Sequence, residues 1–406
     1  MTVVSPFLKD IRVLDFCWVG AGAFVTKLLA DLGAEVIKVE SRARPDNLRL
    51  SPPFRPGAEG LEGSGYFASR NSNKKSFALD MRTPKARAIA LDLAARSHVL
   101  TSNFRPGVLE RWGLGYADIR ELNPSIVYLT MPMQGADGPN SSYIGFGSTI
   151  SALSGLMHLS GRPDRPPVGT GTHYPDHVPN PGHALVALLA ALYHRERTGE
   201  GQAIEVSQLE STVNVIGPAI LAHSLGEPPP GRTGNRVPTA SPHGTFPCLD
   251  DQWIAVSCQK DEHWRAFAQA IGLPGLADDD RFRTLADRKR HEDELEALIA
   301  LTTPDCDRET LVARLRAVGV PAAPVNSSRD VLDDDALVER GYWQHIEHPV
   351  IGPMTVAGPP FRFDGRDRPD LRPAPLLGQH THEVAREVLG LDDATIDALI
   401  AEGVLA

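Results

Sequence analysis

The sequence has few cysteines, and none of them lies in a pattern that indicates a metal site or a disulfide framework. The four are far apart, with no CxxC spacing and no histidine cluster beside them: Cys17, Cys248, Cys258 and Cys306. Isolated thiols in a chain of 406 residues fit a reducing compartment. We therefore expect a cytoplasmic protein without a bound metal.

Long apolar runs and a surplus of positive charge are also missing. The longest apolar stretch, residues 184–193, is too short to span a bilayer. The first ten residues show no basic segment followed by an apolar one, so no signal peptide is predicted. The formal net charge of −10 argues against nucleic acid and anionic membranes as partners, because both need a surplus of Lys and Arg.

Strand and helix patterns alternate through the first half of the chain. The apolar, β-branched segment 11–16 predicts a strand, the residues after a glycine turn predict a helix over 23–32, and 34–39 predicts a second strand. This βαβ unit requires parallel strands. The alternation continues with helices at 84–96, 107–112, 182–197 and 209–225, and with strands at 98–101, 125–130 and 203–207. We predict an α/β fold with a Rossmann-like large domain.

The composition changes at the Pro/Gly run 226–231, which is typical of a linker. We expect residues 1–225 to form the N-terminal part of the large domain, 226–328 the linker and a smaller α/β domain, and 329–406 a return to the large domain. The expected elements after the linker are strand 253–257, helices 261–271, 288–301, 308–318 and 330–340, a strand-like segment 349–363 and a helix after Thr381. Residues 135–180 are irregular, and such a long stretch is commonly functional.

The turn Gly20-Ala21-Gly22 between a strand and a helix invites a dinucleotide-binding interpretation. Glu40 lies about twenty residues on, where a ribose-binding acid would lie. However, Val25 occupies the place of the third glycine, and tight βα turns need glycine for their own geometry. The glycine turn alone does not distinguish a dinucleotide site from an ordinary βα turn. An NAD-binding oxidoreductase therefore remains an alternative, to be tested against the other motifs.

Five segments together resemble class III CoA-transferases, the family of formyl-CoA transferase and of carnitine and bile-acid CoA-transferases. They occur in the family's order and span essentially the whole chain: the stretch 11–40 with LGAEVIKVE, NKKS at 73–76 followed by LDMR, NFRPG at 103–107 leading to RWG, LLAALYHRERTGEGQ at 188–202 and APLLGQHTH at 374–382. The resemblance implies a Rossmann-like large domain, a small inserted domain and an interlocked homodimer.

By this resemblance the catalytic aspartate lies shortly before the LLAAL helix, which identifies Asp176. A nucleophilic carboxylate on a structured loop near a helix start is physically reasonable, whereas the plain alternative is an Asx-turn after Pro175. The implied chemistry is CoA transfer from a donor acyl-CoA, expected to be succinyl-CoA, to an organic acid through anhydride and aspartyl-CoA thioester intermediates. Acyl-CoA is then a substrate, and no permanently bound cofactor is expected.

The resemblance also implies a set of CoA contacts. Near the thioester they are Val19 and Gly20, and around the nucleotide and pantetheine they are Arg42, Leu79, Met81, Arg82, Asn103, Phe104 and Arg111. Arg44 is an alternative to Arg42, because relatives place an arginine directly after the Glu of VIKxE and this chain has Ser41 there. Leu79, Met81 and Phe104 could equally be core residues, and Arg82 and Arg111 exposed charges.

Some features separate this chain from its relatives. The glycine-rich lid of some members is absent, and 241–246 takes its place. In the related α-methylacyl-CoA racemases a histidine precedes the catalytic acid in a GHD-type segment, but here the segment is Gly145-Phe146-Gly147, and phenylalanine cannot move a proton. His158 or His173 would have to substitute for it, so racemase stays an alternative.

The acceptor is expected to be aromatic or dicarboxylic, because CWVGAG at 17–22 and the YPD segment at 174–176 resemble benzylsuccinate CoA-transferases. Arg236, in GRTGNR with Arg232 and Asn235, is the predicted ligand of the acceptor carboxylate, since arginine binds carboxylates bidentately. The alternative is that these are surface charges of the linker.

Overall fold

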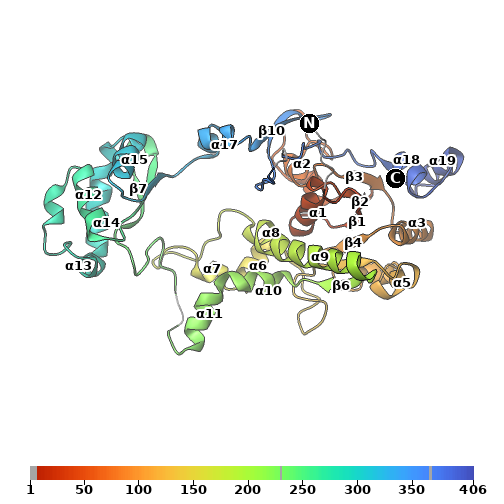
Figure 1. Ribbon diagram of the computed structural model, residues 1–406, viewed down its shortest axis with the longest axis horizontal. Coiled ribbons are helices and arrows are strands. Elements are labelled where there is room, and N and C mark those ends of the chain that lie inside the picture. Colours follow the sequence, from red (N-terminus) through yellow and green to blue (C-terminus); the bar gives the residue numbers. More distant parts are fainter. Residues whose placement is uncertain (1–6, 229–230, 365–367) are drawn as a thin grey trace. The chain divides into compact units, whose positions relative to one another are not determined.

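The computed structural model describes residues 7–228, 231–364 and 368–406 (Figure 1). The chain divides into two compact units. The larger unit comprises the chain up to Met157, Gly169–Pro228 and Val338–Ala406, and the smaller unit comprises His158–Val168 and Pro229–Leu337. Residues 1–6, at the start of the segment tested for a signal peptide, and 229–230, within the expected linker, lie outside the described residues.

A six-stranded parallel sheet forms the centre of the larger unit, which confirms the predicted α/β class. The strand order is β3-β2-β1-β4-β5-β6, and every neighbouring pair is parallel. The bounds are β1 Arg12–Phe16, β2 Glu35–Glu40, β3 Lys75–Ala78, β4 Val99–Ser102, β5 Val127–Thr130 and β6 Gln202–Glu205. This is the doubly wound order, in which the chain reverses direction across the sheet between β1 and β4.

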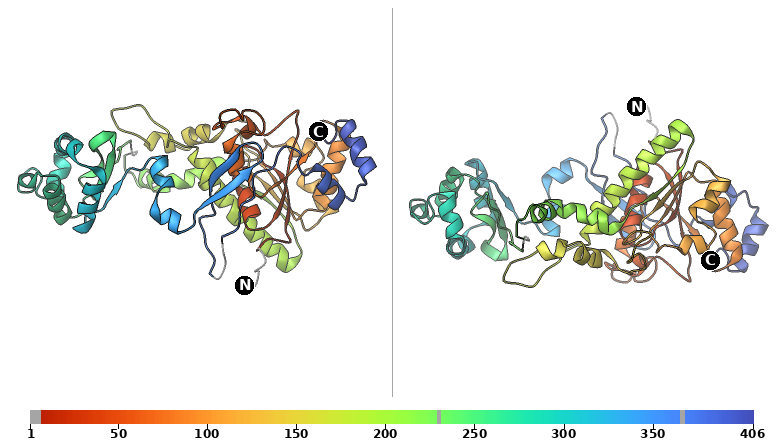
Figure 2. Two further views of the ribbon diagram at one scale, coloured as in Figure 1. Left: turned by 90° about the horizontal axis from the view of Figure 1, so that it is seen from above. Right: turned by 90° about the horizontal axis from the view of Figure 1, so that it is seen from below.

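Alternate side chains of the strands enter two different cores. Val13, Val36 and Val99 face α1 (Ala21–Asp31) and α9 (Pro179–Thr198). Their neighbours Leu14 and Ile37 face the opposite side, where the core is completed by α3 (Pro84–Ala95), α5 (Tyr116–Leu122), α18 (Thr381–Glu387) and α19 (Asp393–Ala401). Helices cover both faces of this sheet (Figure 2), so apolar side chains are buried on both sides of it.

The remaining elements of the larger unit are short. Helices α2 Gly65–Arg70, α4 Val108–Arg111, α6 Gly147–Leu153, α7 Leu156–Leu159 and α8 Tyr174–His177 belong to the connections, with the 3-10 turn η1 Asn47–Leu50. Three of these helices, α6 to α8, lie in the stretch predicted to be irregular. A two-stranded antiparallel ribbon, β10 Trp343–His348 and β11 Gly352–Ala357, accounts for part of the predicted strand-like tail.

Two predicted helices are each divided. The expected helix 209–225 is α10 (Gln208–Val213) and α11 (Gly217–Ser224), joined by η2 (Asn214–Ile216). Pro218 lacks the N–H that a continuous helix would need at that point. The expected helix 330–340 is α16 (Ser328–Leu332) and α17 (Asp335–Glu339). The predictions of one continuous helix at 209–225 and one at 330–340 were therefore wrong in extent.

The smaller unit has its own sheet and its own core. Strands β7 His243–Pro247, β8 Trp253–Ser257 and β9 Ala322–Pro324 pair antiparallel in that order. Around them lie α12 Asp261–Ala270, α13 Leu285–Arg290, α14 Glu292–Thr302 and α15 Arg308–Ala317, with the 3-10 turns η3 Leu249–Asp251, η4 Pro274–Ala277 and η5 Thr303–Asp305. Trp264, Phe267 and Phe282 fill the centre of this core. The segment 241–246, expected where relatives carry a lid, is mostly strand β7 here.

Candidate active site

The site begins at the carboxyl ends of β1 and β4, where ligands bind in doubly wound sheets. The backbone N–H of Trp18 donates to Asn103 Oδ1 over 2.9 Å, and Asn103 Nδ2 donates back to the Trp18 carbonyl over 2.5 Å. The predicted contact residue Asn103 therefore ties the loop after β4 to the loop after β1. Both loops are held at the point where the sheet changes direction.

Val19 has a positive φ of 61°, a strained conformation for a β-branched residue. Its N–H donates to Asp46 Oδ1 over 3.0 Å, while Asp46 Oδ2 binds the ammonium of Lys38 at 2.8 Å. Lys38 also donates to the Cys17 carbonyl over 2.9 Å. These buried contacts stabilise the strained turn immediately before the N-terminus of α1.

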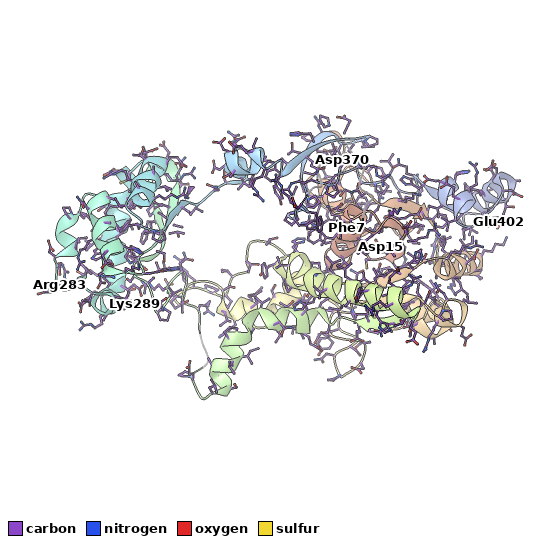
Figure 3. The ribbon with its side chains drawn as sticks, viewed as in Figure 1. Phe7, Asp15, Arg283, Lys289, Asp370 and Glu402 are labelled. Carbon is purple, nitrogen blue, oxygen red and sulfur yellow. The ribbon has the colours of Figure 1, made fainter. Side chains whose placement is uncertain are left out.

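Asp15, a residue of β1 labelled in Figure 3, supports the same loop. Its buried carboxylate accepts from the Cys17 N–H at 2.8 Å and pairs with Lys74 at 3.1 Å. Burial alone would raise the pKa of Asp15, but the ammonium groups of Lys74 and Lys38 outweigh it and the net pKa is lowered. The NKKS motif thus contributes Lys74 to a structural ion pair.

Asp176 lies on the four-residue helix α8, directly before α9. Asp176 is buried, with 7% of its surface exposed. Burial raises the pKa of its carboxyl group to about 6, although the nearby His173 and a hydrogen bond from the Gly147 backbone N–H act in the opposite direction. A carboxyl group with this pKa is ionised at neutral pH and is a better nucleophile than an ordinary aspartate.

Two glycines make room for this carboxyl group. A Cβ atom at Gly20, the N-cap of α1, would stand 2.7 Å from the Asp176 Cβ atom. A Cβ atom at Gly147, the first residue of α6, would stand 2.6 Å from Asp176 Oδ2. The carboxyl group thus lies against the N-termini of two helices, whose free N–H groups favour negative charge.

Asp176 lines a cavity of about 460 Å³, which we call the Asp176 cavity. Its walls include the apolar side chains of Met133, Tyr143, Ile144 and Phe146. Val19, Gly20 and Asn103, all predicted from the sequence, also line it. An apolar wall beside a buried carboxyl group suits a thioester and its pantetheine arm, because both are largely apolar.

A second cavity of about 290 Å³, the Leu79 cavity, contains the predicted residues Leu79, Met81 and Arg82. The two cavities share four lining residues: Trp18, Arg44, Phe104 and Trp112. These shared residues connect the two cavities, as a long ligand such as CoA requires.

Aromatic rings stand at the junction of the two cavities. Phe104 packs edge-on against Trp18, with ring centroids 5.0 Å apart, and against Trp112, with centroids 5.9 Å apart. Such rings offer a stacking surface for a nucleobase. Arg44 and Arg105 bring positive charge to the same walls, and within the described part of the chain neither forms an ion pair. Trp18 and Trp112 were quoted in sequence motifs but were not predicted to bind.

Other predicted residues lie elsewhere. Arg42 and Arg111 are exposed, and neither belongs to the lining of the two cavities. Arg44, the alternative to Arg42, lines both. Arg82 lines the Leu79 cavity but pairs with Asp80 over 2.5 Å. The displacement by two residues, from Arg42 to Arg44, depends on how the loop after β2 turns, which the sequence does not specify.

Arg236 lies in the smaller unit and is surrounded by carboxylates. Its guanidinium pairs with Glu296 at 2.6 Å and Asp293 at 2.5 Å, and Glu292 lies 3.7 Å away. A substrate carboxylate would have to compete with these three groups. The structure therefore lends the predicted acceptor-binding role of Arg236 no support.

Glu40, the possible ribose-binding acid, is 1% exposed and bound on both oxygens. Arg49 donates to Oε1 over 2.7 Å and to Oε2 over 2.9 Å. Ser76 donates to Oε1 as well. This carboxylate is a structural partner of Arg49, which removes the residue on which the dinucleotide interpretation depended.

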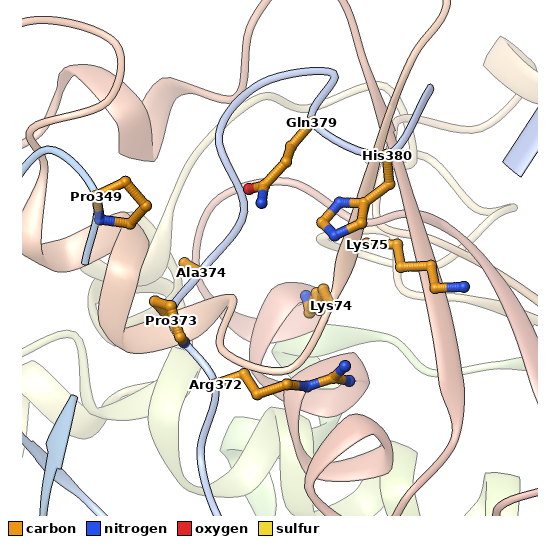
Figure 4. A pocket seen from close by; sticks show the side chains of 8 residues that line it. All are labelled: Lys74, Lys75, Pro349, Arg372, Pro373, Ala374, Gln379 and His380. Atoms are coloured by element: carbon orange, nitrogen blue, oxygen red, sulfur yellow. The ribbon is translucent and has the colours of Figure 1, made fainter. Parts of the chain in front are cut away.

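A further cavity, shown in Figure 4, is lined by Lys74, Lys75, Arg372 and His380 together with Pro349, Pro373, Ala374 and Gln379. Its ammonium groups are already paired, Lys74 with Asp15 and Lys75 with Glu35 and Glu383. Because these charges are neutralised, the cavity has little to offer an anionic substrate. It serves as a packing region between the NKKS segment and the C-terminal segment.

Among residues 7–228, 231–364 and 368–406, no group of three or more His, Cys, Asp or Glu side chains is arranged to hold a metal ion. Within the same residues, no helix combines the length and the apolar character needed to cross a membrane.

The sequence model of CoA-transferase family III matches residues 8–381. The chain belongs to this family. Family III members similar to it include the succinyl-CoA:glutarate CoA-transferase of Mus musculus, 33% identical over 98% of this chain and 90% of that protein. The succinyl-CoA–D-citramalate CoA-transferase of Chloroflexus aurantiacus is also 33% identical, over 98% of each chain. Both matches confirm the predicted class of enzyme, a CoA-transferase.

Solved structures lead to the same family. A CAIB/BAIF family protein from Brucella suis superimposes with a TM-score of 0.87 and 30% identity, covering 95% of this chain and all of that one. Phe146, which the sequence motif matched to the racemase histidine, is 56% exposed and lines the Asp176 cavity.

Proposed function

We propose that this protein transfers CoA from succinyl-CoA to a dicarboxylic acid, with Asp176 as the covalent nucleophile. One observation carries the proposal: a buried carboxyl group with a raised pKa lies against two helix N-termini and lines a cavity. The names of the relatives support the substrate class, since glutarate and D-citramalate are dicarboxylic acids and both enzymes use succinyl-CoA. They favour the dicarboxylic expectation over the aromatic one.

The proposed reaction has two symmetrical halves. The Asp176 carboxylate attacks the thioester carbonyl of succinyl-CoA, the C–S bond breaks, and a mixed anhydride and CoA thiolate result. The thiolate then attacks the aspartyl carbonyl, which gives an aspartyl-CoA thioester and releases succinate. The acceptor carboxylate attacks this thioester, and the returning thiolate takes the acyl group from the second anhydride. Division into easier steps is the advantage of covalent catalysis.

Each attack places negative charge on a carbonyl oxygen. The free N–H groups at the start of α1, around Gly20, Ala21 and Gly22, are the proposed donors to this oxyanion, because the Asp176 carboxyl group lies against that helix end. The hydrogen bond from the Gly147 N–H serves the resting carboxylate. Both helix ends are fixed before the substrate arrives, so little reorganisation is needed during the reaction.

For CoA we propose a path through the two cavities. The thioester and pantetheine occupy the Asp176 cavity next to Val19, Gly20 and Asn103, and the nucleotide end reaches the rings at the junction. The phosphates pair with Arg44 and Arg105, with Arg82 as a further contact. This assignment keeps the predicted residues Leu79, Met81 and Phe104 as apolar walls and replaces Arg42 by Arg44.

The proposed assembly is a homodimer, and the proposed location is the cytoplasm. Four cysteines are free thiols, three of them buried, as a reducing compartment allows. Exposed apolar side chains on α9 and α11, among them Val186, Tyr193 and Leu221, offer surface for a second copy. Light scattering of the purified protein measures the oligomeric state directly.

The test of the proposed reaction is an acyl-exchange assay. Purified protein is incubated with succinyl-CoA and a panel of carboxylic acids, and new acyl-CoA products are identified by mass. We expect glutaryl-CoA to form with the wild type, and to be lost with Asp176→Ala and Asp176→Asn. Exchange of the α-proton of a 2-methylacyl-CoA in deuterated water, without any CoA transfer, would instead establish the racemase alternative.

A further inference from the structure

Arg70, the last residue of α2, carries a charge without a carboxylate partner. Within the described part of the chain it forms no ion pair, its Nε is buried without a hydrogen-bond partner, and its polar contact is a long one of 3.5 Å from Nη2 to His177 Nδ1. Burial lowers the pKa of Arg70. Removing a cation from water without an anion is costly, so an anionic ligand would be stabilised there.

Aromatic rings hold this guanidinium in place. Its central carbon lies 4.7 Å from the centroid of Phe24 and 5.8 Å from that of Tyr66. The Tyr66 hydroxyl lies 3.2 Å from His177 Nε2, and the ring of His177 packs edge-on against Phe24. An arginine stacked in this way presents its planar N–H fork in one orientation, which suits bidentate binding of a carboxylate.

The neighbours of Arg70 leave its charge uncompensated. Burial, with help from the charges of Arg70 and His173, lowers the pKa of His177 to about 4, so its ring is neutral at pH 7. Burial raises the pKa of Tyr66, and the charge of Asp176 contributes in the same direction, so the phenol is neutral too. The cluster of Arg70, Tyr66 and His177 therefore has one positive charge, enough for one carboxylate.

The cluster and the nucleophile lie along the same helix. Asp176 lies against Gly20 and the guanidinium of Arg70 lies against Phe24, four residues further along α1. Residues four apart share one helix face and are separated by about 6 Å along the axis. The carboxyl carbons of a four- or five-carbon dicarboxylic acid are joined by three or four C–C bonds of about 1.5 Å, which is a comparable span.

We propose that Arg70 binds the second carboxylate of the dicarboxylic acid whose first carboxylate reacts at Asp176. The inference rests on the proposed function, because it assumes that acyl transfer takes place at Asp176. It assigns substrate choice to the larger unit, whereas the sequence had suggested Arg236. Arg70 is then a specificity-determining residue: it selects acids with a second charge at the correct distance and leaves the bond-making steps to other groups.

Two acceptors of equal chain length test this role. Glutarate and pentanoate differ only in that a methyl group replaces one carboxylate. Both are assayed with the same donor, succinyl-CoA, so that any effect of a variant on the donor cancels in the ratio of the two kcat/KM values. We expect the wild type to prefer glutarate by at least 100-fold and Arg70→Met to reduce this ratio to below 5, mainly through loss of activity with glutarate.

Arg197→Met is the matched control, since Arg197 also stacks on a tyrosine, Tyr193, at 5.6 Å but is exposed on α9. It should keep the wild-type ratio. Arg70→Lys retains the charge but not the fork, and we expect it to lower the ratio about 10-fold. This second variant keeps the test decisive if Arg70→Met does not fold, which its melting temperature will show.

The outcomes separate the two proposals. If wild-type protein transfers CoA in an Asp176-dependent manner but Arg70→Met and Arg70→Lys keep the wild-type ratio, the inference about Arg70 is overturned and the proposed function stands. An equal loss with both acceptors also overturns it, because it indicates a structural role. If the wild type transfers CoA to no acid, or Asp176→Asn remains active, the proposed function itself fails.

Discussion

The carboxyl group of Asp176 lies so close to Gly147 that a Cβ atom at that position would stand 2.6 Å from Oδ2. The backbone N–H of the same glycine donates a hydrogen bond to the carboxylate. Gly147 thus supplies a hydrogen-bond donor and carries no side chain. The reaction requires both properties, because the buried carboxylate must be bound and must still have room for an acyl group.

Replacement of Gly147 by alanine is therefore expected to displace the nucleophile without unfolding the protein. A displacement of about 1 Å can cost 100-fold in rate. We expect kcat/KM for CoA transfer to fall at least 100-fold in Gly147→Ala, with a melting temperature within a few degrees of wild type. Gly182→Ala is the control, because a Cβ atom there meets nothing within 4 Å. Equal activities of the two variants would contradict the close packing.

The pH dependence of the reaction should follow the raised pKa of Asp176. Only the ionised carboxylate is a nucleophile, and burial raises its pKa to about 6. We expect kcat/KM for succinyl-CoA to rise between pH 5 and 7 with an apparent pKa near 6, and then to stay constant. Steady-state rates in buffers of constant ionic strength measure this. A profile that is flat from pH 5 to 8 would contradict the assignment.

The free energy of unfolding should fall over the same pH range in which the activity rises. The pKa of Asp176 is higher in the folded state than its ordinary value of 3.8, so its favourable contribution is complete below pH 3.8 and is lost as the pH rises through about 6. At pH 8 we expect Asp176→Asn to raise the free energy of unfolding by about 1–3 kcal/mol. Urea titrations at pH 8 and near pH 4 measure the difference, which should vanish at the lower pH.

The buried pair Glu40–Arg49 should matter for folding and not for a cofactor. Both residues are 1% exposed, and Glu40→Gln would leave the guanidinium paired with Glu62, a carboxylate at 2.7 Å that is 23% exposed. Because Glu62 compensates part of the charge, we expect a loss of about 1–3 kcal/mol in the free energy of unfolding. The exposed pair Lys85–Glu402 gives the control, because Glu402→Gln should cost less than about 0.5 kcal/mol. A stable Glu40→Gln protein would show that Glu40 has another role.

Binding of CoA should distinguish Arg44 from Arg42. Arg44 lines both cavities, whereas Arg42 lines neither. We expect Arg44→Met to raise the Kd of CoA about 10-fold, as loss of a charge-assisted phosphate contact implies, and Arg42→Met to change it less than 2-fold. Isothermal titration calorimetry at fixed ionic strength makes the comparison. A larger increase in Kd for Arg42→Met than for Arg44→Met would instead assign the phosphate contact to Arg42.

Much of the larger fold could be predicted, because its signals are local. The βαβ pattern from β1 to β2 and the long helix α9 follow from apolar periodicity and a glycine turn. Strand β3, Lys75–Ala78, was missed: it begins at the second residue of the pair Lys74-Lys75 and offers no clear alternation. The predicted helix 209–225 was too long, because its continuous apolar run was given more weight than Pro218, which interrupts a helix.

The site was predictable only in part, for a different reason. Asp176 and the residues at the carboxyl ends of β1 and β4 come from motifs, and the order of strands brings them to one place. The choice of Arg44 over Arg42 depends on the turn of an exposed loop, and the pairing of Arg236 with Glu296 depends on tertiary packing in the smaller unit. The lack of a carboxylate partner for Arg70 depends on the residues that pack around it, so no sequence motif predicts it.

The central claim is that Asp176 becomes covalently attached to CoA. Wild-type protein incubated with succinyl-CoA alone, quenched in acid and digested, should give a peptide containing Asp176 with the mass of a CoA thioester. Hydroxylamine should convert it to the aspartyl hydroxamate, and Asp176→Asn should give neither. Full CoA transfer to glutarate without any adduct on Asp176, or with an adduct on another residue, would contradict the account.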